Sequence, residues 1–294
     1  MKGMWRQSGL AALGLLLVLP GASTAQTPAA ASVPVATTTG IIYATHSTGP
    51  LHLDLHRPAG KGLAPVLVVL HGGGWARGER PKSWTGLRPF VEAGYAIVSV
   101  QYRLSGTAQA PAAVQDARCA MAWVAREADR HQLDPRRIVV MGTSAGAHLA
   151  LMAGMLGNKS DLDLPVCGAV PRAAAILDFY GPSDLRPESL GQWRSPSVTK
   201  WIGEGPGAAA LAARMSPLTL VRKGQPPVFI VHGDADDVVP IQSSQQLKAA
   251  LDRARVPSEF HTVPGGGHGK FGAEVQARLY ADALRFLGRH RITP

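Results

Sequence analysis

The sequence predicts an α/β fold, in which a doubly wound, mostly parallel sheet carries helices on both faces. Short, mainly apolar runs recur along the chain, at residues 66–70, 95–100, 137–141, 173–177 and 228–231. Runs of this kind are typical of central parallel strands that are buried on both faces. Helix-forming stretches separate them, and two of these, at 111–128 and 241–253, begin at or just after a proline. Strands that alternate with helices in this way indicate a single α/β domain.

One strand at the start of the sheet has a different pattern. Residues 51–56 alternate strictly between leucine and a polar residue. Alternation with a period of two is typical of a half-exposed antiparallel strand. The pattern therefore predicts that His52 and His56 point toward solvent.

The first residues have the features of an export signal. Lys2 and Arg6 precede an apolar run at 10–19, and small residues end at Ala25. We expect residues 1–25 to be a signal peptide, residues 26–40 to be a flexible leader rich in alanine, proline and threonine, and residues 41–294 to form one catalytic domain. The apolar run is shorter than a bilayer requires, so we expect a secreted or periplasmic protein with no membrane span after signal removal.

The chain is basic but carries no concentrated basic block. Its formal net charge is +10, with lysine and arginine spread along the sequence. This distribution favours a solvated surface over a nucleic-acid interface, so we expect no nucleic-acid partner. A basic surface nevertheless favours encounters with anionic polymers.

Two cysteines, Cys119 and Cys167, are present. Cys119 falls in the predicted helix 111–128, and Cys167 precedes the strand predicted at 173–177. In an exported protein the pair is compatible with a disulfide or with two buried thiols, and the sequence leaves both open.

A candidate nucleophile follows the third apolar run. Gly142-Thr143-Ser144-Ala145-Gly146 lies between the run at 137–141 and a helix-forming stretch at 145–156. A sharp strand-to-helix turn of this kind exposes the serine side chain above the sheet, and small neighbours let the strand and helix approach closely. The motif predicts that Ser144 is a nucleophile.

A glycine-rich loop precedes it. Residues 71–75, His-Gly-Gly-Gly-Trp, follow the run at 66–70 directly. Backbone N–H groups stabilise an oxyanion only where no side chain blocks their approach. We assign the N–H groups of Gly73, Gly74 and Ala145 to this role, and expect His71 to orient the loop.

An acid and a base follow the serine. Asp234, Asp236 and Asp237 come just after the run at 228–231, and Asp236 is our choice for the acid, with Asp237 and then Asp234 behind it. His268 lies among glycines at 265–269 and is the predicted general base and then general acid. The order serine, acid, histidine is the one that this class of nucleophile turn requires.

These motifs resemble those of the α/β-hydrolase esterases, in particular the BD-FAE-like branch, a cap-less relative of the hormone-sensitive-lipase-type carboxylesterases. The resemblance extends from Ile41 to the C-terminus and rests on residues 71–75, 134–137, 142–150, 180–184 and 232–240. It implies an α/β-hydrolase fold without a large cap domain and a carboxylic ester hydrolase. Two positions differ from many relatives: Ala147 replaces a second glycine, and Asp237 replaces proline or a small polar residue.

The function expected from these features is that of a secreted serine carboxylesterase acting on short acyl esters, above all acetate, carried by a small molecule or a polysaccharide. The sizeable insertion at 181–225 is rich in proline and glycine and predicts an open cleft. We expect Trp193 and Trp201, both in this insertion, either to stack on sugar rings or to pack in the core. The alternatives are a feruloyl-type aromatic esterase, an amide hydrolase of kynurenine formamidase type, and a non-catalytic binding domain. No cofactor or metal is expected, because no known ligand spacing is found.

Overall fold

In the computed structural model, the chain divides into two units, Met1–Ser32 and Val33–Pro294. The structure describes residues 1–4, 33–60, 62–188 and 195–294. Most of the expected signal peptide and the start of the expected leader lie outside the described residues. Within the described part, no helix combines the length and the hydrophobicity needed to cross a bilayer.

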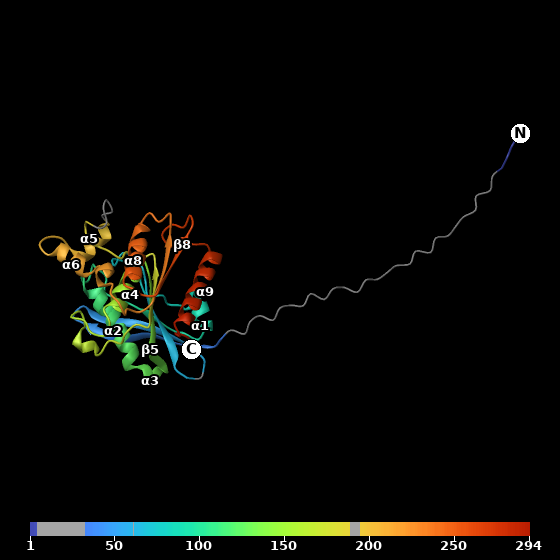
Figure 1. The fold of residues 1–294 in the computed structure, drawn as a ribbon. Helices are drawn as coiled ribbons and strands as arrows, with labels where there is room; N and C mark the ends of the chain where they lie inside the picture. The colour runs from blue at the N-terminus through green and yellow to red at the C-terminus, as the bar shows by residue number, and fades with distance from the viewer. Residues whose placement is uncertain (5–32, 61, 189–194) are drawn as a thin grey trace. The chain divides into compact units, whose positions relative to one another are not determined.

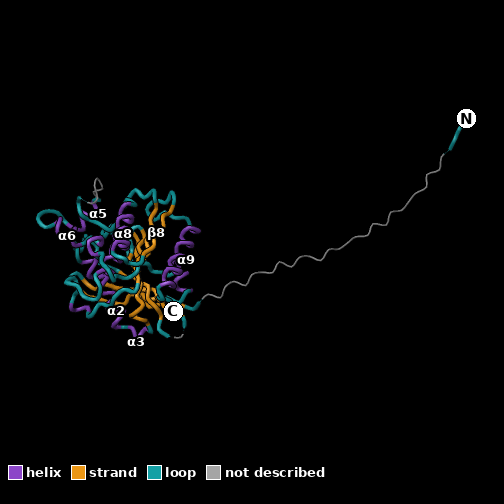
Figure 2. Tube along the Cα trace, in the orientation of Figure 1, coloured by secondary structure: helices purple, strands orange, loops and turns teal. Residues whose placement is uncertain are grey.

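The second unit is built on one mostly parallel sheet, as predicted (Figure 2). In the described residues its eight strands have the order β1-β2-β4-β3-β5-β6-β7-β8. The antiparallel pairs are β1 with β2 and β2 with β4, and all other neighbours are parallel. The strands are β1 (Val35–His46), β2 (Gly49–Pro58), β3 (Ala64–Leu70), β4 (Ala96–Val100), β5 (Leu133–Thr143), β6 (Ala175–Phe179), β7 (Val228–Gly233) and β8 (Ser258–Val263).

Helices cover both faces of this sheet (Figure 1). On one face α2, α4 and α8 bury their apolar residues, and on the other face α1 and α9 do so. Residues that alternate along each strand divide between these two cores, for example Val68 and Val69. The helices are α1 (Arg88–Glu92), α2 (Ala112–Arg126), α3 (Ala128–His131), α4 (Ala145–Met155), α5 (Pro196–Ile202), α6 (Ala208–Arg214), α7 (Pro217–Leu220), α8 (Gln242–Arg253) and α9 (Ala273–Arg289), with single 3₁₀ turns at Thr85–Leu87 and Pro165–Cys167.

The N-terminal edge differs from the prediction. Strand β1 begins at Val35, so the last residues of the expected leader, 35–40, belong to the sheet. They pair with β2 over the register from Val35 opposite Pro58 to Thr38 opposite Leu55. Backbone pairing does not need a buried side chain, and threonine fits strands well, so a segment whose apolar residues are only Val35 and Ala36 still forms an edge strand.

The prediction that both histidines of β2 point toward solvent is wrong for His56. Asp54 and His56 are each 1% exposed, because side chains from Arg80 and from the paired strand β1 lie against them. Asp54 pairs with Arg80 at 2.9 Å and accepts a hydrogen bond from the Gly40 N–H. His56 Nδ1 lies 3.0 Å from the Thr37 hydroxyl. These polar side chains are therefore buried with partners.

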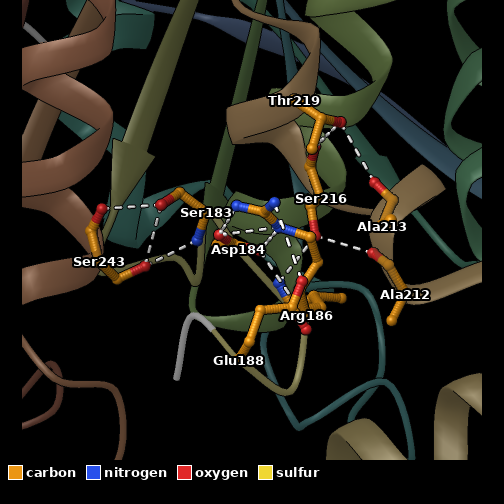
Figure 3. Close-up of polar contacts among 10 residues, drawn as sticks. Ser183, Asp184, Arg186, Glu188, Ala212, Ala213, Ser216, Thr219 and Ser243 are labelled. Carbon is orange, nitrogen blue, oxygen red and sulfur yellow. Dashed lines mark hydrogen bonds and ion pairs between the residues drawn. The ribbon is translucent and has the colours of Figure 1, made fainter. Parts of the chain in front are cut away.

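The insertion at 181–225 is fixed to the core by hydrogen bonds between buried serines (Figure 3). The N–H of Ser183 donates to the hydroxyl of Ser243 at 2.7 Å, and the Ser183 hydroxyl donates to the Ser243 carbonyl at 2.7 Å. Within the insertion, the N–H of Leu185 donates to the Ser216 hydroxyl at 2.8 Å. Buried hydrogen bonds of this kind specify one conformation, because a lost partner would leave a polar group unpaired. They hold the insertion beside the carboxyl ends of the strands.

Cys119 and Cys167 form a disulfide, which resolves the alternative that the sequence left open. Their Cα atoms lie 5.2 Å apart, and the bond joins α2 to the segment that precedes β6. It closes a loop with a sequence separation of 48 residues. Both cysteines are buried, so the bond links two parts of the same core.

Breaking this disulfide should lower the free energy of unfolding by about 4 kcal/mol, because the unfolded chain regains the entropy of the open loop. The measurement is denaturant unfolding of the wild type with and without reductant. The double variant Cys119→Ser with Cys167→Ser is the control: it should have the lower stability and should not respond to reductant. Equal stability of the wild type and the double variant would contradict the prediction.

Candidate active site

Ser144 occupies a strained turn between β5 and α4. Its φ is 53° and its ψ is −122°, a backbone conformation that non-glycine residues rarely adopt. The turn is closed by two glycines: a Cβ atom on Gly142 would lie 2.2 Å from the Gly146 backbone, and one on Gly146 would lie 2.1 Å from the Leu70 carbonyl oxygen. No larger residue fits either position without moving the strand or the helix. The serine side chain consequently stands at the carboxyl end of the sheet.

His268 and Asp236 lie next to this serine. His268 Nε2 is 2.8 Å from Ser144 Oγ, and His268 Nδ1 is 2.7 Å from Asp236 Oδ2. The histidine follows β8 and the aspartate follows β7, so parallel strands bring both loops to the same edge of the sheet. With the proton on Nδ1, the ring donates to the carboxylate and accepts from the serine hydroxyl. In this arrangement Ser144 can pass its proton to the imidazole.

The carboxylate of Asp236 is enclosed by hydrogen-bond donors. Its side chain is 0% exposed. Oδ1 accepts from the N–H groups of Val238 and Val239 at 2.8 and 2.9 Å, and Oδ2 lies 3.2 Å from His232 Nε2. Burial alone would raise the pKa, but the hydrogen bonds from His232, His268 and the two backbone groups outweigh it and hold the pKa of Asp236 well below its usual range. Asp236 is therefore charged at neutral pH.

The two other candidate aspartates point elsewhere. Asp234 accepts a hydrogen bond from the Gly265 N–H at 2.6 Å and so ties the loop after β7 to the loop that carries His268. Asp237 is exposed. Of the three aspartates, Asp236 is the one that contacts His268.

His232 and Ser244 were not assigned a role from the sequence, yet both support Asp236. His232 is fully buried at the end of β7, and its Nδ1 lies 2.7 Å from the Ser244 hydroxyl. Its Nε2 lies 2.9 Å from the Val239 carbonyl oxygen as well as near the Asp236 carboxylate. A proton on Nε2 serves both acceptors, while Ser244 donates to Nδ1. A signal was available in the sequence, since His232 directly follows the apolar run before the aspartates.

The glycine-rich loop borders the serine. Gly73 and Gly74 have φ values of 117° and 59°, in the region that favours glycine. Both line one cavity of about 330 Å³ with Ser144, Ala145 and His268, which we call the Ser144 cavity. A Cβ atom on Gly73 would lie 2.0 Å from the Arg77 carbonyl oxygen, so its conformation and its surroundings both exclude a side chain. The loop can therefore present backbone N–H groups beside Ser144.

His71 stabilises the glycine-rich loop through hydrogen bonds and ring stacking. Its Nδ1 donates to the Gly72 carbonyl at 2.7 Å, and its ring stacks on Tyr102 with the centroids 4.3 Å apart. The Tyr102 hydroxyl donates to the His71 carbonyl at 2.8 Å. Burial lowers the pKa of His71, which keeps the ring neutral. These contacts agree with the structural role expected for His71.

For Trp201, the structure selects one of the two roles that the sequence left open. Trp201 is fully buried and stacks on Trp75 with ring centroids 4.8 Å apart, so it packs in the core and does not face a sugar. Trp193 lies outside the described residues. The insertion contributes Pro182, Ser195 and Ser197 to the wall. In the described part of the chain, no group of three or more histidine, cysteine, aspartate or glutamate side chains is arranged to hold a metal ion.

Comparison with known proteins identifies the family. The BD-FAE family model matches residues 53–251. The chain belongs to the BD-FAE family of α/β-hydrolase esterases, which confirms the predicted fold and family. Esterase LipQ of Mycobacterium tuberculosis is 32% identical over 76% of this chain, and the match spans 55% of LipQ. The chain thus spans about half the length of that curated relative.

Solved structures of esterases share this architecture. A truncated carbohydrate esterase from gut microbiota superposes with a TM-score of 0.71 at 26% identity, covering 90% of this chain and 99% of that one. Esterase Est2 of Thermogutta terrifontis, solved with butyrate bound, superposes with a TM-score of 0.72 at 25% identity, covering 90% of this chain and 96% of that one. Both matches cover nearly the whole of the solved chains.

A second buried carboxyl lies close to the site. Asp178, on β6, accepts a hydrogen bond from the Gly181 N–H at 2.9 Å through Oδ1, while Oδ2 has no partner among the described residues. Burial raises the pKa of Asp178 to about 7, although the backbone hydrogen bond and nearby His232 act in the opposite direction. Asp178 therefore keeps its proton under mildly acidic conditions where an unfolded chain would lose it.

Asp178→Asn should increase stability above neutral pH. Between about pH 4 and pH 7 the unfolded chain loses the Asp178 proton and the folded chain keeps it, so wild-type stability falls as the pH rises through this window. Asparagine keeps Oδ1 as an acceptor but does not titrate. The free energy of unfolding of the variant, relative to that of the wild type, should therefore rise with pH by a few kcal/mol and then level off. Urea unfolding from pH 4 to 8 measures it, with exposed Asp129→Asn as the control. An advantage that does not change with pH would contradict the assignment.

Proposed function

We propose that this protein is a serine carboxylesterase that works through an acyl-enzyme, with Ser144 as the nucleophile. The observation that carries the proposal is the chain of hydrogen bonds from Ser144 through His268 to Asp236. His268 Nε2 takes the hydroxyl proton as Ser144 Oγ attacks the ester carbonyl carbon. Asp236 holds the ring in the tautomer that can accept this proton and stabilises the imidazolium that results.

The tetrahedral intermediate needs donors for its oxyanion. The N–H groups of Gly73, Gly74 and Ala145 border the Ser144 cavity and are our assignment for this role. Loss of one such donor raises the barrier by about 3 kcal/mol. When the intermediate collapses, His268 gives its proton to the departing alcohol. Water then attacks the acyl-enzyme by the same route and releases the acid.

A short acyl group, above all acetate, is our proposal for the substrate. The Ser144 cavity is about 330 Å³, near the lower end of the range for small-molecule sites, and part of it must hold the alcohol. The butyrate bound to the Thermogutta esterase and the description of the gut protein as a carbohydrate esterase support a short acyl group on a sugar. An export signal at residues 1–25 would bring the enzyme to such polymers, in the periplasm or outside the cell.

Asp236→Asn should lower kcat by about 10⁴-fold, because asparagine cannot stabilise the imidazolium and can favour the wrong tautomer of His268. Asp237→Asn is the matched control, since it makes the same chemical change at an exposed neighbour and should stay within about threefold of wild type. The measurement is steady-state hydrolysis of 4-nitrophenyl acetate. A larger loss for Asp237→Asn would overturn the assignment of the acid.

Specificity constants for 4-nitrophenyl esters should fall beyond about four acyl carbons. Each added methylene gains its burial energy of about 0.8 kcal/mol only where an apolar pocket receives it. The series from acetate to decanoate tests this, with Ser144→Ala as the control that should remove nearly all turnover. A maximum at eight or more carbons, or a preference for a feruloyl ester or a formamide over acetate, would contradict the proposed substrate.

A further inference from the structure

Arg77 gives the Ser144 cavity a positive charge that the proposed ester hydrolysis does not use. Of the described residues that line this cavity, Arg77 alone carries a permanent charge, and none of them is an acid. Arg77 is exposed, and within the described residues it makes no ion pair and no side-chain hydrogen bond. A guanidinium in a concave site with no partner of its own is a ready receptor for an anion.

Three acids of the described residues are paired with cations other than Arg77. Asp54 pairs with Arg80 at 2.9 Å, and Asp116 pairs with Arg103 at 2.7 Å. The exposed Glu79 lies 3.3 Å from Lys82. None of these three acids therefore compensates the charge of Arg77.

The backbone fixes Arg77 beside the glycine-rich loop. The N–H groups of Ala76 and Arg77 both donate to the Gly73 carbonyl at 3.1 Å. A Cβ atom on Gly73 would lie 3.3 Å from Arg77 Cγ, so the stem of the arginine packs against this glycine. The backbone and the side-chain stem of Arg77 therefore lie next to the proposed oxyanion donors.

A hydroxyl lies at the neighbouring glycine. A Cβ atom on Gly74 would lie 2.6 Å from Ser197 Oγ, and Ser197 also lines the cavity. The Ser197 hydroxyl has no hydrogen-bond partner among the described residues. A guanidinium and a free hydroxyl thus flank the Gly73–Gly74 pair, which is a suitable donor set for one carboxylate.

We propose that Arg77, assisted by Ser197, binds a carboxylate carried by the ester substrate, so that the preferred substrates are anionic esters such as acetylated uronic acids. This inference rests on the proposed function, since it names the class of ester that the Ser144 cavity receives. The guanidinium fork matches the two oxygens of a carboxylate and forms charge-assisted hydrogen bonds that a neutral sugar does not offer. Arg77 is then a specificity residue: it fixes the substrate beside Ser144 without taking part in the proton transfers.

The test compares matched substrates that differ in one charge. O-Acetylated methyl glucuronic acid is compared with the corresponding glucuronamide, which has a similar shape and no charge. A second pair, 4-nitrophenyl hemisuccinate and 4-nitrophenyl butyrate, places the carboxylate on the acyl side.

The quantity measured is the ratio of kcat/KM within each pair. The wild type should prefer the anionic member of at least one pair by about tenfold at low ionic strength, and salt should reduce the preference. The pair in which the anionic member is preferred identifies whether the carboxylate lies on the alcohol side or the acyl side of the ester.

Variants assign the preference to Arg77. Arg77→Gln should reduce the ratio to near one, Arg77→Lys should retain part of it, and Ser197→Ala should lower it by a few fold. Arg253→Gln removes one positive charge from an exposed site on α8 and should leave the ratio at its wild-type value, which controls for overall charge. Thermal unfolding checks that each variant is folded.

Two results would overturn the inference: a wild-type ratio near one for both pairs, or a preference that survives Arg77→Gln. The wild-type ratios need no variant, so the inference can be rejected even if Arg77→Gln does not fold. Neither result affects the proposed function, which is tested separately by the loss of 4-nitrophenyl acetate turnover in Ser144→Ala.

Discussion

The close approach of the β5–α4 turn to the end of β3 is the constraint on which the rest of the site depends. No space remains for a Cβ atom at Gly142 or Gly146, because each would meet backbone atoms at about 2 Å. This packing holds Ser144 in a backbone conformation that would otherwise be unfavourable by about 1–3 kcal/mol. It also places the first N–H of α4 opposite the glycine-rich loop that follows β3. The serine and the proposed oxyanion donors are thus positioned by the same contact.

Two aspartates, one on β6 and one in the loop that follows the neighbouring strand β7, show how the surroundings select opposite charge states. Asp236 receives hydrogen bonds from two backbone N–H groups and two histidines, and these hold its pKa well below the usual range despite burial. Asp178 receives one backbone hydrogen bond, and burial raises its pKa to about 7. Deeper burial and fewer hydrogen-bond donors both raise the pKa of Asp178 relative to that of Asp236. The charged carboxylate lies where an imidazolium would form, and the second carboxyl adds no competing negative charge there at mildly acidic pH.

The parts of the site that the sequence predicted are those with local signals. Ser144 lies in a short motif at a strand-to-helix turn, and His268 lies in a glycine-rich loop after a strand. Because parallel strands end at one edge of the sheet, the chain order of such loops also predicts that their side chains meet. The structure brings these residues within hydrogen-bond distance of each other.

What the sequence could not predict depends on distant partners. Burial of Asp54 and His56 follows from pairing with β1 and from Arg80, neither of which alters the local alternation. Trp201 lies in a segment whose composition is typical of a surface insertion. Its ring nevertheless stacks on Trp75, more than a hundred residues earlier in the chain. The disulfide and the free charge of Arg77 likewise depend on which side chains lie nearby in space. Patterns along the chain carry no information on such pairings.

The central claim is that Ser144 is the nucleophile made reactive by its neighbours, and active-site labelling tests it most directly. An alkyl fluorophosphonate reacts with a serine that is activated by a general base and accepts a tetrahedral oxyanion. Intact-mass analysis after incubation should show one adduct per chain, and peptide mapping should place it on Ser144. Labelling should be slowed strongly in His268→Ala. An adduct on another residue, or hydrolysis of 4-nitrophenyl acetate that persists at full rate after labelling, would contradict the account.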